Sequence, residues 1–249
     1  MKWQLIESGF CSGCNNMQFD IALANNCPDE EAFFRLYQWH PYCISLGANQ
    51  NPADINQEKA AADGIEIVKR PTGGRAILHA EEITYSIVIP VASGLTSTEI
   101  YKKVSQALVR GLKLYSPKLA KVELENRQPD FAGLLKEPSG LVCFASTAKS
   151  EVKYESLKLI GSAQRKMNRV ILQHGSILCG SYHMKLIDYL RLPAREVELI
   201  KEELQYKTTD ISSITGNSVD YSQLSVKLIQ GFEQEWGINL THKPMEVSS

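Results

Sequence analysis

The chain has 249 residues, which is enough for a sizeable hydrophobic core within one domain. Its 27 basic residues nearly balance its 28 acidic residues, so a formal net charge of −1 argues against bulk nucleic-acid or membrane-surface binding. No run approaches the roughly 20 apolar residues of a membrane span, and the first residues lack the apolar core of a signal peptide. We therefore expect a cytoplasmic globular protein that recognises its partners through a local site.

The first half of the chain predicts mostly strands. Residues 3–7 alternate and predict a strand, and a helix over 15–25 follows with Asn15 or Asn16 as its cap. Another helix is expected over 51–64. Further strands are expected at 33–39, 43–47, 65–70, 75–79 and 82–90.

The second half adds a long helix and a helical end. Thr96 and Glu99 form a capping box, and the apolar residues behind it mark one face of a helix that ends near Tyr115. Strands are expected at 141–146, 156–161 and 168–179, and helices at 183–190, 194–205 and 221–237. Strands occur in runs, which favours an α+β fold, a mixed β-sheet packed with helices, over a doubly wound sheet. We interpret residues 1–249 as a single domain with a helical C-terminal end from about residue 183.

The cysteines indicate free thiols. Six of them stand at irregular positions, and only Cys11 and Cys14 form a C-x-x-C pair. A zinc site needs a second pair of ligands, and a thioredoxin-like site needs the pair to open a helix in a βαβ unit. Because no second pair follows, we interpret this pair as structural or coincidental and predict no metal site.

Two stretches have the layout of a ligand site. Residues 69–79, KRPTGGRAILH, match neither a P-loop nor a dinucleotide fingerprint, and the two glycines alone are equally typical of a hairpin turn. The flanking cations and histidine favour an anionic or polarised ligand. Residues 157–178 repeat the layout, with small residues before Gln164 and Arg165 and a strand that carries His174. The two units could form two walls of one pocket.

Lys158 and Cys143 are candidate catalytic residues with competing interpretations. Lys158 lies on an otherwise apolar strand, where it either reaches solvent or points inward to polarise a carbonyl or stabilise an anion. Cys143, between apolar residues, is either a small core residue or a nucleophile. A reactive thiol needs a cation or base nearby, and Lys158 follows fifteen residues downstream. Among the histidines, only His79 and His174 follow the two loops.

These segments resemble the signatures of the lipoate/biotin protein ligase and octanoyltransferase family. Residues 69–90 resemble its R-R-x-[ST]-G-G-[GR]-A-[VI]-x-H motif, and residues 158–178 resemble K-x-x-G-S-A-Q…Q-H-G-[ST]-[IL]-L. Residues 3–23 resemble the opening W-x-x-[IL]-x-[ST]-G…N-M-x-x-D-x-A-L. The similarity covers roughly residues 3–235, and the fold of that family, a mixed sheet packed with helices, agrees with the strand and helix pattern. Arg165 stands one position away from the family's usual arginine.

The family contains two chemistries, and three features favour one of them. ATP-dependent ligases make lipoyl-adenylate, whereas octanoyltransferases take octanoate from acyl carrier protein without ATP. The loop reads T-G-G-R-A where ligases usually have S-G-G-G-A, and the next strand reads EITYS where ligases usually have G-N-x-N-[FY]. Cys143 and Phe144 match the position of the cysteine nucleophile in the octanoyltransferases that this chain resembles most.

The resemblance implies a catalytic pair, Cys143 and Lys158, with Cys143 forming an acyl-enzyme and Lys158 and nearby backbone N–H groups stabilising the oxyanion. The residues implied in substrate binding are Arg70, Gly73, Gly74, Arg75, Ala76, His79, Gly161, Ser162, Ala163, Gln164, His174 and Gly175. We expect the glycine backbone to approach the thioester end of the substrate. An apolar tunnel for the acyl chain is expected around Ile77 and Ile171.

The resemblance also implies the partners. The donor would be acyl carrier protein, and the acceptor a lysine of a lipoyl-accepting protein such as glycine-cleavage H protein or a dehydrogenase lipoyl domain. No cofactor is expected, and ATP and Mg²⁺ would enter only if the chain were a lipoate ligase. A lipoyl-domain amidotransferase and a non-catalytic module that binds acylated lysine are further alternatives. Neither nucleic acid nor membrane is expected as a partner.

Overall fold

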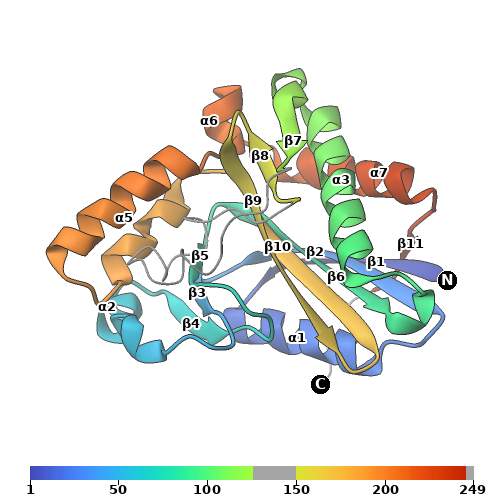
Figure 1. Ribbon diagram of the computed structural model, residues 1–249, viewed down its shortest axis with the longest axis horizontal. Helices are drawn as coiled ribbons and strands as arrows, with labels where there is room; N and C mark the ends of the chain where they lie inside the picture. Colours follow the sequence, from blue (N-terminus) through green and yellow to red (C-terminus); the bar gives the residue numbers. More distant parts are fainter. Residues whose placement is uncertain (126–149, 245–249) are drawn as a thin grey trace.

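The computed structural model describes residues 1–125 and 150–244. In these ranges the strands form two sheets, and helices cover both faces of the larger one (Figure 1). This arrangement confirms the expected α+β class. The strand expected at 141–146, which contains Cys143, lies outside the described residues.

The larger sheet is mixed. Within the described residues its order is β11 (Thr241–His242), β1 (Lys2–Cys11), β2 (Glu31–Trp39), β6 (Glu82–Pro90), β10 (Val170–Leu178), β9 (Leu157–Met167), β8 (Val152–Tyr154) and β7 (Val122–Leu124). β1 is parallel to β11 and to β2, and the remaining neighbours are antiparallel. The strands expected at 33–39, 82–90, 156–161 and 168–179 are therefore confirmed, and β1 is longer than the expected 3–7.

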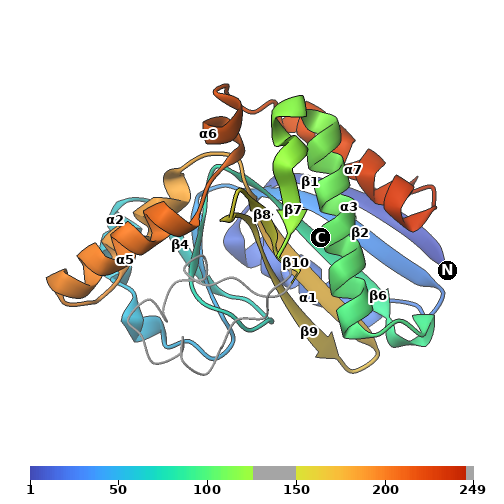
Figure 2. The same cartoon turned by 45° about the horizontal axis from the view of Figure 1, so that its top comes forward.

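Helices α3 (Ser97–Tyr115) and α7 (Tyr221–Trp236) lie side by side over one face of the larger sheet, and α1 (Gly13–Asn26) lies on the other (Figures 1 and 2). The main hydrophobic core sits under α3 and α7. Alternate residues of β6 enter that core: Ile83, Tyr85, Ile87 and Ile89. The intervening residues of β6 therefore face α1, because side chains alternate along a strand.

The smaller sheet has the order β4 (Glu66–Lys69), β3 (Cys43–Leu46), β5 (Ile77–His79). Its apolar residues pack with a second core, to which α2 (Gln57–Ala62), the 3₁₀ segment Tyr182–Tyr189 and α5 (Ala194–Lys207) contribute. The strands expected at 43–47, 65–70 and 75–79 thus exist, each slightly shorter. They belong to a sheet of their own beside the larger one (Figure 1).

Side-chain caps explain where the helices begin. The capping box is confirmed, because Thr96 Oγ1 accepts a hydrogen bond from Glu99 N at 3.2 Å and Glu99 Oε2 accepts one from Thr96 N at 2.8 Å. The expected asparagine cap of α1 was wrong, since Ser12 Oγ accepts the bond from Asn15 N. Ser12 precedes the asparagines, so the helix starts earlier than expected.

Two expected helices differ from the structure. The stretch 51–64 divides into the 3₁₀ turn Pro52–Asp54 and α2, because Asn56 caps a new helix by accepting a hydrogen bond from Lys59 N at 3.1 Å. Residues 183–190 lie mainly in 3₁₀ turns. The C-terminal part contains α5, α6 (Ile211–Thr215) and α7, and then returns to the sheet as β11. No helix in the described ranges is long and apolar enough to cross a membrane.

Candidate functional site

The α1-facing side of the central strands is polar. Cross-strand pairing aligns Arg35 of β2 with Ser86 of β6 and with His174 of β10. The next row on the same face aligns Tyr37, Thr84 and Ser176. All six side chains are buried. Two rows of polar side chains therefore lie beneath α1, in the interior of the molecule, where each needs a hydrogen-bonding partner.

The side chain of Asp20 in α1 binds residues of both rows. Its side chain is fully buried and accepts hydrogen bonds from Arg35 Nη1 at 2.8 Å, Tyr37 Oη at 3.1 Å and Ser86 Oγ at 2.8 Å. His174 Nδ1 lies 3.6 Å from Asp20 Oδ2. Burial raises the pKa of Asp20, but the Arg35 guanidinium and His174 outweigh this effect, so the pKa lies below its ordinary value. Asp20 is therefore a buried carboxylate whose charge Arg35 neutralises.

His174 joins the two loop segments that the sequence singled out. Its Nε2 lies 2.6 Å from Thr72 Oγ1 in the loop between β4 and β5. Arg165 Nη1 of β9 donates to the carbonyl oxygen of Pro71 in the same loop at 2.6 Å. Burial lowers the pKa of His174 more than Asp20 raises it. The expected pair of walls is thus confirmed, with a histidine held in its neutral form at the junction.

The glycines between Arg70 and Arg75 serve the loop itself. Arg70 folds back so that Nη2 donates to the carbonyl oxygens of Gly73 at 3.1 Å and Arg75 at 2.6 Å. Gly74 has φ +90°, a conformation that side chains rarely adopt, and a Cβ there would lie 2.9 Å from Arg70 Nη2. A Cβ on Gly47, at the end of β3, would lie 2.0 Å from the carbonyl oxygen of Gly74. The close approach is therefore between two backbone segments.

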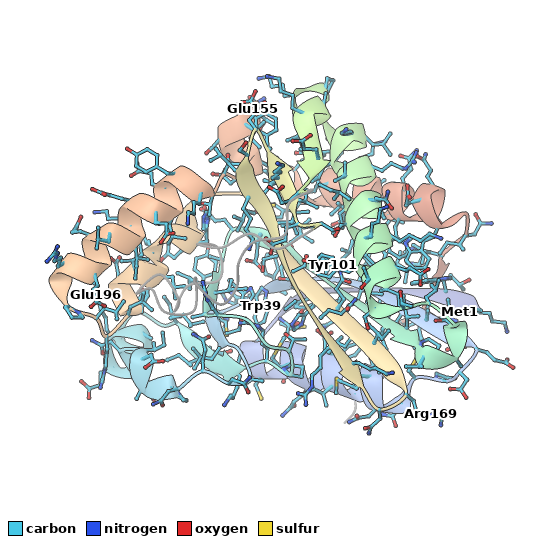
Figure 3. All side chains as sticks on the ribbon, viewed as in Figure 1. Met1, Trp39, Tyr101, Glu155, Arg169 and Glu196 are labelled. Atoms are coloured by element: carbon cyan, nitrogen blue, oxygen red, sulfur yellow. The ribbon has the colours of Figure 1, made fainter. Side chains whose placement is uncertain are left out.

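His79 sits between a hydroxyl and a carboxylate. Its Nε2 lies 2.7 Å from Ser45 Oγ of β3, and its Nδ1 lies 2.8 Å from Glu82 Oε1 of β6. Arg70 Nη1 donates to Ser45 Oγ at 3.0 Å, which links this group to the loop. Trp39, near the centre of the molecule (Figure 3), stacks on the imidazole with ring centroids 4.0 Å apart. Ser45, His79 and Glu82 are all buried.

A pocket with an empty volume of about 330 Å³ opens between the two sheets at this point. Its lining residues are Met17, Tyr37, Trp39, Ser45, Arg70, Ile77, His79, Thr84, Gly161, Ser162, Ala163, His174, Gly175 and Ser176. Ile77 lines it as expected. Ile171 belongs instead to the core under α3 and α7, so its place in an apolar tunnel was wrong. It lies three residues from His174 on the same strand and therefore points to the opposite face.

Several predicted substrate-binding residues lie outside this lining. Gly73, Gly74, Arg75 and Ala76 belong to the same loop but are not part of the pocket wall. Gln164 Nε2 donates to the carbonyl oxygen of Ser97 at the start of α3, which is on the far face of the sheet. Their roles toward substrate remain predictions.

Lys158 points inward, so the solvent-facing interpretation was wrong. The side chain is 1% exposed, and its Nζ lies 2.8 Å from Glu151 Oε1. Lys158 is not among the pocket-lining residues, although Gly161 on the same strand is. Its proposed partner Cys143 lies outside the described residues, and the pairing of the two remains a prediction.

The sequence interpretation missed the residues that support the two histidines. These residues, Asp20, Arg35, Trp39, Ser45 and Glu82, come from a helix and three strands that approach one another only in the fold. One signal was present in β6, where polar residues alternate with the apolar residues that predicted the core face. A polar row opposite a buried row on a central strand indicates a buried polar site once both faces are covered.

The C-x-x-C pair does open a helix in a βαβ unit. Cys11 ends β1, Cys14 lies in the first turn of α1, and β2 runs parallel to β1. Both are free thiols, and Cys14 is exposed. In the part of the chain that the structure describes, no group of three or more His, Cys, Asp or Glu side chains is arranged to hold a metal ion.

Comparisons of the sequence with known proteins agree with one another. The sequence profile of the lipoyl protein ligase A/B catalytic domain matches residues 13–233. The chain is 34% identical over 248 residues to octanoyltransferase LipM of Kyrpidia tusciae, covering 96% of this chain and 88% of the relative. It is 32% identical to octanoyltransferase LipM of Bacillus subtilis and to that of Staphylococcus aureus, in each case over 99% of this chain and 90% of the relative.

Solved structures with the same fold are lipoate protein ligases. A putative lipoate protein ligase from T. acidophilum with bound lipoic acid superposes with a TM-score of 0.76 at 16% identity, over 99% of this chain and 90% of that one. Lipoate-protein ligase A bound with ATP gives 0.76 at 17% identity, over 99% and 90%. At these identities the likeness concerns the fold, which is the fold that the sequence motifs implied.

Proposed function

This chain belongs to the lipoyl protein ligase A/B catalytic domain family, and we propose that it transfers an octanoyl group from acyl carrier protein to a lysine of a lipoyl-accepting protein. The observation that carries the proposal is the similarity, at 32–34% identity over 96–99% of the chain, to relatives named octanoyltransferase LipM. The pocket between the two signature segments supports the proposal, because residues of both segments line it.

In the proposed reaction the Cys143 thiolate attacks the octanoyl thioester and forms an acyl-enzyme. The acceptor amine then attacks that acyl-enzyme, so one difficult exchange becomes two easier ones. Lys158 supports this mechanism because its side chain is buried and pairs with Glu151. Cys143 precedes it by fifteen residues in the sequence. A buried cation stabilises a thiolate and a developing oxyanion more strongly than an exposed one.

The pocket suits the end of an acyl chain beside a polar head. Met17, Trp39 and Ile77 supply apolar wall, while the two histidines and Arg70 supply the polar part. Burying about seven CH₂ or CH₃ groups at ~0.8 kcal/mol each contributes roughly 5–6 kcal/mol to binding. A contribution of this size to the binding free energy is large enough for the enzyme to discriminate between acyl chains of different length. The proposal requires no ATP and no metal ion.

Intact-protein mass spectrometry tests the proposal. The enzyme is mixed with octanoyl-acyl carrier protein in the absence of ATP, as wild type, as Cys143→Ser and as Cys14→Ser. Wild type and Cys14→Ser, which lacks an exposed thiol outside the pocket, should both gain one octanoyl group. Cys143→Ser should gain none as a thioester. Acceptor modification that appears only with lipoate and ATP would instead assign the chain to the ligases.

A further inference from the structure

The hydrogen-bond partners of His79 indicate which ring nitrogen carries the proton and which accepts a hydrogen bond. Arg70 Nη1 can only donate, so Ser45 Oγ accepts from it at 3.0 Å. The Ser45 hydroxyl then donates its own hydrogen to His79 Nε2 at 2.7 Å. His79 Nδ1–H in turn donates to Glu82 Oε1 at 2.8 Å. The result is a directed chain of hydrogen bonds from the pocket wall to a buried carboxylate.

The surrounding side chains hold this chain rigidly. Trp39 stacks on the imidazole at an interplanar angle of 11°, and its Nε1 donates to Thr84 Oγ1 at 2.7 Å. Thr84 Oγ1 donates in turn to Glu82 Oε1. Ser176 Oγ lies 3.2 Å from His79 Nδ1. Both the ring and the carboxylate are therefore oriented by buried neighbouring side chains.

The Glu82 carboxylate can still pair with a positively charged group. Its side chain is 1% exposed, and Oε2 has no hydrogen-bond partner among the described residues. No ion pair of Glu82 within the described ranges involves a lysine or an arginine. The carboxylate of Asp20, by contrast, is already neutralised by Arg35 at 2.8 Å. A proton on His79 would thus meet a negative charge that no lysine or arginine of the described part of the chain compensates.

We propose that Ser45, His79 and Glu82 form a proton relay that accepts the proton released by the attacking lysine of the acceptor protein. This inference rests on the proposed function. Ser45 and His79 line the pocket, and the Ser45 hydroxyl has a second lone pair with which to accept a hydrogen bond from an ammonium. A lysine side chain enters as an ammonium at neutral pH and must lose a proton before its nitrogen is a nucleophile.

The proposed step balances as follows. The ammonium gives one proton to Ser45 Oγ as Ser45 passes its own proton to His79 Nε2. The free amine adds to the thioester carbonyl, the carbon–sulfur bond breaks, and the sulfur leaves with the electron pair and takes the second proton of the nitrogen. The imidazolium, held by Glu82, later returns its proton to water. An amide and a thiol are formed, and one proton is released to solvent.

Charges around the relay set its pH dependence. Glu82 faces His79 from β6, Arg70 reaches it through Ser45 from the loop, and His174 and Tyr37 face the same pocket from β10 and β2. Positive charge on His79 and on Arg70 lowers the pKa of His174, after the larger effect of burial. A proton accepted at His79 would therefore lower the pKa of His174 further.

The test separates proton acceptance from a structural role. Octanoyl-enzyme is prepared for wild type and His79→Gln, and its decay is followed with a lipoyl-accepting protein and, separately, with hydroxylamine, an amine that is uncharged at neutral pH. Transfer to the protein lysine should slow about a hundred-fold in His79→Gln, and its rate should rise more steeply with pH than that of wild type. Decay with hydroxylamine should remain similar.

Two further variants make the result decisive if His79→Gln folds poorly. Glu82→Gln keeps the shape and removes the charge, and it should show the same selective loss. His174→Gln should slow decay with both amines to a similar extent, because that histidine positions the loop. Equal losses with both amines in His79→Gln and Glu82→Gln, or no loss at all, would overturn the relay. Absence of an octanoyl-enzyme on wild type would overturn the proposed function and the relay with it.

Discussion

Two histidine–carboxylate pairs that differ in one respect lie at the pocket, and the histidine of each pair lines it. His174 stands beside Asp20, and His79 stands beside Glu82, with all four side chains buried. Asp20 also binds the Arg35 guanidinium, whereas Glu82 accepts, besides the bond from its histidine, only one from the neutral Thr84 hydroxyl within the described residues. A histidine and a carboxylate therefore form a neutral structural junction in one place and a proton-accepting pair in the other. The Arg35 guanidinium, which is present in the first pair, accounts for the difference between the two roles.

Removing Arg35 should abolish this difference and has the largest expected effect. In Arg35→Met the buried Asp20 loses its cation, so the free energy of unfolding should fall by about 3–5 kcal/mol. The pKa of His174 should rise, because no other lysine or arginine among the residues that the structure describes pairs with Asp20. Urea unfolding measures the first effect, and the imidazole NMR signals of His174 as a function of pH measure the second.

Arg110→Met is the matched control for that experiment. Arg110 pairs with Glu235 at 3.0 Å, but its side chain is 49% exposed. Loss of such a surface pair should change the free energy of unfolding by less than about 1 kcal/mol. Equal losses in the two variants would show that Asp20 does not depend on Arg35.

The loop between β4 and β5 contacts His174 through Thr72 and contacts Ser45, the partner of His79, through Arg70, so disturbing it tests whether the two pairs share one support. Gly74→Val forces a β-branched residue into φ +90° and places its Cβ against Arg70, which should destabilise the protein by about 1–3 kcal/mol. Octanoyl loading should fall with it, because Arg70 lines the proposed substrate pocket. Thermal unfolding and the mass assay measure the two effects.

Gly73→Ala gives the contrast one residue away. A Cβ on Gly73 meets no atom within 4 Å, and its φ is not in the left-handed region. We expect a change within about 0.5 kcal/mol and normal loading. If both substitutions were tolerated equally, the positive φ of Gly74 would not matter to the loop.

The smallest expected effect is a pH dependence of stability that comes from the neutral histidine. The pKa of His174 is lowered by burial, so the unfolded chain binds a proton near pH ~6.5 that the folded protein does not yet bind. The unfolded state then holds more protons, and stability should fall as pH drops below ~6.5, by at most about 1.4 kcal/mol per pH unit. Asp20, whose pKa is also lowered, adds a further loss below pH ~4.

Urea unfolding at several pH values checks this dependence. His174→Gln should flatten the slope between pH ~7 and ~5 relative to wild type. His242→Gln, which removes a histidine that is 71% exposed, should leave the slope as it is. His183, whose pKa burial also lowers, contributes to the same window in every variant and cancels in the comparison. Identical slopes in all three proteins would contradict a neutral His174.

Local patterns in the sequence predicted the elements well. The capping box at Thr96 and the alternation along β6 depend on neighbours within a few residues, so they could be identified without the fold. Alternation along β10 would likewise have placed Ile171 on the face opposite His174. Ile171 would then not have been assigned to the expected tunnel. The asparagine cap of α1 was wrong because Ser12, another good cap, stands just before it.

The candidate site was predicted in part. Both loop segments were identified, and Thr72 and Arg165 confirm that they meet. The supporting carboxylates were not, because Asp20 and Arg35 are fifteen residues apart on a helix and a strand, and Ser45 and His79 are on different strands. The one local signal for Glu82 was its place on the polar face of β6, where polar and apolar residues alternate.

The chain's motifs, its caps and the two faces of its strands follow from interactions over a few residues, and these were sufficient to identify the family and its α+β fold. The charge state of each buried group depends on which distant side chains surround it, since electrostatic energy in a low-dielectric interior varies steeply with distance. Only folding brings Arg35 to Asp20, whereas within residues 1–125 and 150–244 no lysine or arginine pairs with Glu82. The positions of these two pairs thus explain why two similar histidines have different roles.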